Sequence, residues 1–95
     1  MTFEERIVPP LTRLSHKLLD AGLFGYLENV ANFMVAITSG RWSQLPDDEQ
    51  LMWLDRLSGL LGARGLMDSW DMTDPDLSEC HTILDGQIRA LKKRN

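Results

Sequence analysis

The sequence predicts an all-α fold, a small four-helix bundle-like domain that spans residues 1–95. Turn and cap signals divide the chain into four helical segments, and no alternation of polar and apolar residues is long enough to indicate a strand. A chain of 95 residues suits a single domain, because neither half would be long enough to build its own core. The 43% apolar and 25% charged residues are typical of a globular domain and argue against disorder.

The first helix is expected over residues 9–21. Pro9 and Pro10 suit the first turn of a helix, where a missing N–H group costs nothing. Gly22 follows the last apolar position, as a left-handed C-terminal cap would. The inward stripe of this helix consists of Leu11, Leu14, Leu18 and Ala21.

The second helix, residues 23–39, is apolar around far more of its circumference than one small core can use. Its central stripe is Leu23, Leu27, Val30, Met34 and Ile37, one flank is Tyr26 and Phe33, and the other flank is Phe24, Ala31 and Val35. The apolar arc covers about 200°, twice the arc of a surface helix. A four-helix monomer would leave one flank exposed, and this predicts an interface.

The third helix is expected over residues 46–61, because Pro46 stands at its first position and three acids follow in the first turn. The fourth helix is expected over residues 75–93, with Asp74 as its N-cap and Pro75 at its first position. Leucines spaced by three or four residues give the third helix an inward stripe, which consists of Leu51, Leu54, Leu57 and Leu61, with Trp53 and Leu60 beside it.

Residues 62–73 are the least regular part of the chain, and we expect one short turn there. This turn would tuck Leu66, Met67 and Trp70 under the bundle. Three glycines precede or begin the segment at intervals of three residues, namely Gly59, Gly62 and Gly65. Glycines at this spacing line up on one helical face, so we expect them to allow close packing of a neighbouring helix; a flexible end of the third helix is the alternative.

The residues offer no catalytic, cofactor or metal site. Four acids lie within nine residues, Asp68, Asp71, Asp74 and Asp76, but they lack the spacing and the glycine of a calcium-binding EF-hand loop, so helix capping and solvation explain them. Cys80 and His81 are adjacent and would point about 100° apart on a helix, so both could not easily bind one metal ion. The other histidine, His16, is expected on the outer face of the first helix, and Cys80 is expected to be buried.

The net charge of −4 and pI near 5 disfavour nucleic acid as a partner, because binding to DNA or RNA depends on clustered cations. The basic tail formed by Arg89, Lys92, Lys93 and Arg94 is instead favourable at the C-terminal end of a helix. The first residues do not resemble a signal peptide, and residues 23–37 are too short to span a bilayer. We therefore expect a cytoplasmic protein without a membrane partner.

These observations predict a non-enzymatic protein-binding regulator, adaptor or inhibitor, which also forms a homodimer through its second and third helices. A small helical carrier of an apolar ligand is the alternative, and an enzyme without a recognisable motif is a further one. Met52 is on the polar side of the third helix, where its apolar side chain would be exposed to solvent unless a partner covers it. The expected interface consists of Phe24, Tyr26, Leu27, Val30, Phe33, Met34, Ile37, Met52 and Trp53.

Overall fold

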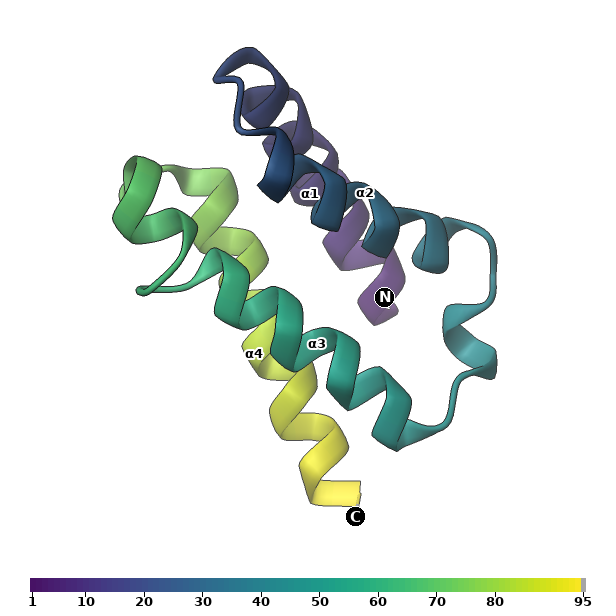
Figure 1. Ribbon diagram of the computed structural model, residues 1–95. Coiled ribbons are helices and arrows are strands. Elements are labelled where there is room, and N and C mark those ends of the chain that lie inside the picture. The colour runs from purple at the N-terminus through teal and green to yellow at the C-terminus, as the bar shows by residue number, and fades with distance from the viewer. Residues whose placement is uncertain (95) are drawn as a thin grey trace.

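The computed structural model describes residues 1–94 and confirms the all-α, four-helix arrangement (Figure 1). The helices are α1 (Phe3–Asp20), α2 (Phe24–Thr38), α3 (Asp47–Leu61) and α4 (Pro75–Arg94). A short 3-10 helix, η1 (Trp42–Gln44), joins α2 to α3, and a π-helical turn, η2 (Met67–Asp71), lies between α3 and α4. No strand is present within residues 1–94.

The four helices are not packed equally against one another. Helix α1 packs closely against both α2 and α4, and α3 packs closely against α4. The remaining neighbours, α2 and α3, contact each other much less. In Figure 1, α2 accordingly lies over α1, α3 lies over α4, and the two pairs face each other.

Helix α1 begins at Phe3, and our expectation of a start at Pro9 was wrong. Thr2 caps the helix, since its hydroxyl oxygen accepts a hydrogen bond of 3.2 Å from the backbone N–H of Glu5. Phe3 and Ile7 continue the apolar stripe of α1 and are buried. Their burial, worth about 1.5–3 kcal/mol each, offsets the hydrogen bonds that the prolines remove from the helix interior.

The turn between α1 and α2 has the expected left-handed glycine. Gly22 has a φ of +73°, and its N–H donates to the carbonyl of Leu19 while the N–H of Leu23 donates to the carbonyl of Leu18. This pair of hydrogen bonds is a Schellman motif, which ends α1 and reverses the chain into α2.

An aromatic cluster joins the start of α1 to α2, η1 and α3. The rings of Phe3 and Trp42 are 5.7 Å apart, and Phe33 lies 5.3 Å from Trp42 and 6.2 Å from Trp53. The buried Gln50 holds η1 in place, because its side-chain amide donates to the carbonyl of Trp42 at 2.8 Å. These contacts position the α2–α3 connection against the core.

Ion pairs join α1 to the first turn of α4. The Asp74 carboxylate caps α4 by accepting hydrogen bonds from the backbone N–H groups of Asp76 and Leu77, and Lys17 Nζ lies 2.7 Å from its other oxygen. Asp76 pairs with Lys17 at 2.8 Å and with Arg13 at 2.8 Å. The predicted cap is confirmed, but Asp76 is buried and paired where we expected solvation. Hydrogen bonds from Lys17 and Arg13 lower the pKa of Asp76.

The segment between α3 and α4 folds under the bundle as expected, since Leu66 is buried and Met67 and Trp70 pack against the core. The three glycines have different surroundings, however. A Cβ on Gly62 would lie 3.2 Å from His81 Nε2 of α4, and a Cβ on Gly65 would overlap the carbonyl oxygen of Leu60. Gly59 faces open space, so close helix packing explains only Gly62.

Alanine substitutions at Gly59 and Gly65 should change the free energy of unfolding in opposite directions. Gly65→Ala should lower the free energy of unfolding by about 1–3 kcal/mol, because the backbone at the end of α3 must move. Gly59→Ala is the matched control and should raise it by about 0.5–1 kcal/mol, because alanine is a better helix former at an exposed position. Urea unfolding followed by circular dichroism measures both changes. Equal effects of the two substitutions would contradict the tight turn at Gly65.

The ion pairs between α1 and α4 should make stability depend on pH. Asp76→Asn should lower the free energy of unfolding by about 1–2 kcal/mol at neutral pH. Because the pKa of Asp76 is lowered in the folded state, the carboxylate stabilises the fold above its ordinary pKa of about 3.9 and loses this effect as pH falls through the lowered value. The difference between the variant and the original protein should therefore shrink in acid. Asp68→Asn, at an exposed position, controls for the loss of one negative charge.

Candidate functional site

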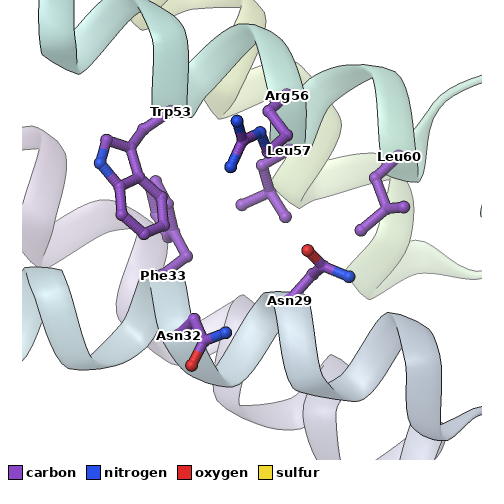
Figure 2. Close-up of a pocket in the computed structure, with 7 residues that line it drawn as sticks. All are labelled: Asn29, Asn32, Phe33, Trp53, Arg56, Leu57 and Leu60. Carbon is purple, nitrogen blue, oxygen red and sulfur yellow. The ribbon is translucent and has the colours of Figure 1, made fainter.

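A cleft of about 70 Å³ lies between α2 and α3, the two neighbouring helices that contact each other much less than the other pairs do. Figure 2 shows that side chains from both helices converge on it. Its lining residues are Asn29, Asn32 and Phe33 from α2, and Trp53, Arg56, Leu57 and Leu60 from α3. We call it the central cleft.

Two further hollows adjoin the central cleft. A shallow hollow of about 470 Å³ at the start of α2 shares Asn29 and Leu60 with it. A hollow of about 110 Å³ adjoins the cleft on the α3 side alone, where it is lined by Met52, Trp53 and Arg56. The three hollows form one surface feature, the α2–α3 groove.

The groove combines an apolar floor with a polar rim. Phe33 and Leu57 form the floor and are buried, while Trp53 and Leu60 are half-buried at its sides. The exposed polar side chains at the rim are Asn29, Asn32 and Arg56. Within residues 1–94, Arg56 has no ion pair. The Asn29 amide donates a hydrogen bond of 2.9 Å to the carbonyl of Gly25, so within residues 1–94 Asn32 and Arg56 are the rim side chains without a hydrogen-bond partner.

The structure divides the expected interface residues into three groups. Val30, Phe33 and Ile37 are at most 5% exposed and belong to the core of this chain, because α2 turns this stripe inward. Val30 and Ile37 therefore offer no free surface to a partner, and our assignment of them to the interface is corrected. Phe33 lines the central cleft only as its covered floor. The half-buried residues are Tyr26, Leu27, Met34 and Trp53, and the exposed ones are Phe24 at 62% and Met52 at 64%.

The second apolar surface is the flank of α2 that the fold leaves uncovered. Tyr26 and Phe33 pack against the core, whereas Phe24, Ala31 and Val35 remain exposed, Val35 at 54%. We call these three residues the outer stripe. Ala31 and Asn32 are neighbours in the helix and point about 100° apart, so the outer stripe and the central cleft lie on different sides of α2.

Sequence reasoning missed the polar rim and Leu60 as site residues. The spacing of Trp53, Arg56 and Leu60, which places them on one side of α3, was a usable signal. Asn29 and Asn32 are polar residues within an otherwise apolar helix, and nothing in their spacing marks them as site residues. Nothing in the sequence showed that α2 and α3 would stand apart with these residues facing each other.

The residues that could carry chemistry lie away from the groove. Cys80 is buried as expected, and burial raises the pKa of its thiol to about 12, so it stays protonated at neutral pH. His16 is exposed on α1 as expected. The Ser58 hydroxyl donates to Asp85 at 2.8 Å, and His81 Nδ1 lies 3.5 Å from the other Asp85 oxygen. Since the serine bonds to the carboxylate and not to the imidazole, this is not a nucleophile–base pair.

The described part of the chain has neither a cluster of metal ligands nor a helix that could span a membrane. Residues 1–94 contain no group of three or more His, Cys, Asp or Glu side chains placed to hold a metal ion. Over the same residues, none of the helices combines the length and the apolar character that crossing a bilayer requires.

The two phenylalanines of α2 should respond differently to truncation. Phe33→Ala should lower the free energy of unfolding by about 3–5 kcal/mol, because Phe33 is fully buried in the aromatic cluster. Phe24→Ala, at an exposed position, should change it by less than about 0.5 kcal/mol. Urea unfolding measures both values. Similar losses for the two variants would contradict the placement of Phe33 in the core of this chain.

Comparison of the chain with protein-family models, with curated proteins and with solved structures finds no match. No residue role is therefore carried over from another protein. The chemistry of the α2–α3 groove is the ground for the functional proposal.

Proposed function

We propose that this protein is a non-enzymatic protein-binding regulator, adaptor or inhibitor that receives an α-helix of a partner protein in the α2–α3 groove. The observation that carries this proposal is an open groove between two helices, with a buried apolar floor and a polar rim. Helices bind such grooves by laying an apolar face against the floor, with anchors one turn apart.

The size of the groove suits a helix. The residues that line the groove run from 24 to 33 in α2 and from 52 to 60 in α3, about 14–15 Å of each helix, which is the length of nearly three turns of a partner helix. The groove also contains the residue types that dominate binding energy at protein interfaces, namely Trp53, Tyr26 and Arg56. Met52 at one end gives an adaptable apolar surface, which accounts for a methionine exposed on α3.

The alternatives fit the groove less well. A carrier must enclose most of its ligand, in a cavity of about 300–1,000 Å³. The central cleft, at about 70 Å³, is far smaller, and the hollow of about 470 Å³ beside it is shallow and open. An enzyme would need acid–base or nucleophilic groups, and the groove lining contains no carboxylate, imidazole or thiol.

Self-association is a second candidate, and the outer stripe favours it. Phe24 and Val35 are both more than half exposed on one side of α2, with the small side chain of Ala31 between them. In a dimer with a twofold axis, the outer stripe of one chain would pack against the outer stripe of the other, and both stripes would be buried without another protein. We therefore propose a homodimer through α2 as an additional property of the chain.

Substitutions at two neighbouring residues should show whether the partner binds the groove or the outer stripe. A photo-crosslinking residue in place of Leu60 captures the partner in host extract, and mass spectrometry identifies the cross-linked segment. Asn32→Arg puts a long cation across the central cleft and should weaken binding of that purified partner by about tenfold or more, a cost of about 1.4 kcal/mol. Ala31→Arg is the control, because this exposed residue is on the same helix but outside the groove.

The outcomes assign each surface. If neither substitution weakens binding, or if the cross-linked segment is not helical, the groove is not the binding surface and the proposal fails. If only Ala31→Arg weakens it, the partner binds the outer stripe. Light scattering coupled to size exclusion tests self-association: the protein should be a dimer that Ala31→Arg converts to a monomer. A monomer at high micromolar concentration refutes the dimer.

A further inference from the structure

We infer that the helix bound in the α2–α3 groove presents a carboxylate to Arg56, within one turn of the apolar side chain that fills the central cleft. This inference rests on the proposed function and names the chemistry of the partner. It comes from the one charged side chain among the residues that line the groove.

Arg56 is placed to bind a ligand group. Figure 2 shows its guanidinium between Trp53 and Leu57, on the side of α3 that faces Asn29 and Asn32. Three other cations in the described residues, on α1 and α4, pair with acids: Arg13 with Asp76, Lys17 with Asp74, and Arg94 with Asp47. Arg56 has no such partner within residues 1–94, and what distinguishes it from the other cations without an ion pair is its place in the groove lining; those others are Arg6, Arg41, Arg64, Arg89, Lys92 and Lys93.

The surroundings of Arg56 favour a carboxylate over other groups. A guanidinium presents a planar fork of N–H donors, which matches the two oxygens of a carboxylate. Asn32 adds an exposed amide on the opposite side of the cleft. A lysine at this point of a partner helix would be repelled by Arg56, since no acid in the groove lining offsets the charge.

The distance between the carboxylate and the apolar anchor follows from α3. Arg56 and Leu57 are consecutive, and Trp53 and Leu60 are one turn away on either side. Arg56 and Leu57 lie at nearly the same level of α3 and point about 100° apart, so a side chain within one turn of the residue over Leu57 is within reach of the long Arg56 side chain. The central cleft has a volume of about 70 Å³. A group the size of a water molecule needs about 10–15 Å³, so the cleft has room for the few carbon atoms at the end of one aliphatic side chain.

Three helical peptides test the inference. Each has about 15 residues, the same leucine stripe on one face, and either Glu, Gln or Lys one turn from the central leucine. Fluorescence anisotropy measures their affinities for the whole chain. The Glu peptide should bind about fivefold to tenfold more tightly than the Lys peptide, with Gln between them, and added salt should reduce this difference.

Substitutions of Arg56 complete the test. Arg56→Glu should reverse the order of the three peptides, and Arg56→Gln should remove it; both should fold, because Arg56 is exposed. Arg89→Glu is the matched control, an exposed arginine on α4 outside the groove, and should keep the original order. If the peptides bind but their order does not depend on Arg56, this inference is overturned while the proposed function stands. If Asn32→Arg leaves the affinity of all three unchanged, the proposed function fails as well.

Discussion

The packing of α1 against α4 is the constraint on which the rest of the structure depends. One face of α1 is buried along its whole length, through Phe3, Ile7, Leu11, Leu14 and Leu18. Helix α2 is then held on α1, and α3 is held on α4. The separation of α2 and α3 is therefore set mainly by the two helices beneath them, with the contact of Phe33 and Trp53 as a direct link between the two, and the groove results from this arrangement.

The two ends of the α1–α4 pair are held by different interactions. At one end, Arg13 and Lys17 pair with buried carboxylates that also begin α4, so the ion pairs align the two helices along their length. At the other end, Phe3 contacts Trp42, and the aromatic cluster reaches across to Trp53 of α3. This cluster supplies the floor and one side of the groove, so the groove is built on rigid, buried groups that need little reordering on binding.

The proposed function gives a use to surfaces that the fold itself does not need. Helix α2 has three surfaces: an inward stripe that is buried in the core, a polar side that faces α3, and the exposed outer stripe. Ala31 and Val35 lie on a different side of α2 from the central cleft, whereas Phe24 also lines the hollow at the end of the groove. A partner helix in the central cleft and a second copy on Ala31 and Val35 could therefore bind together. A regulator assembled in this way would offer two identical grooves on one dimer.

The sequence by itself determined the helices, their apolar stripes and most of their ends, because caps and periodicity are local properties. Gly22 and Asp74 are examples, each set by the few residues around it. It did not determine the start of α1. Pro9 and Pro10 are typical of the first turn of a helix, but the burial of Phe3 and Ile7 stabilises a helix that begins six residues earlier. Nor did it show which residues of α2 are free. Val30, Phe33 and Ile37 are apolar like Phe24 and Val35, and only packing distinguishes the core from the surface. Arg56 and Asn32 face each other across a cleft because α1 and α4 hold their helices apart, and this relation between distant segments exists only in the tertiary structure.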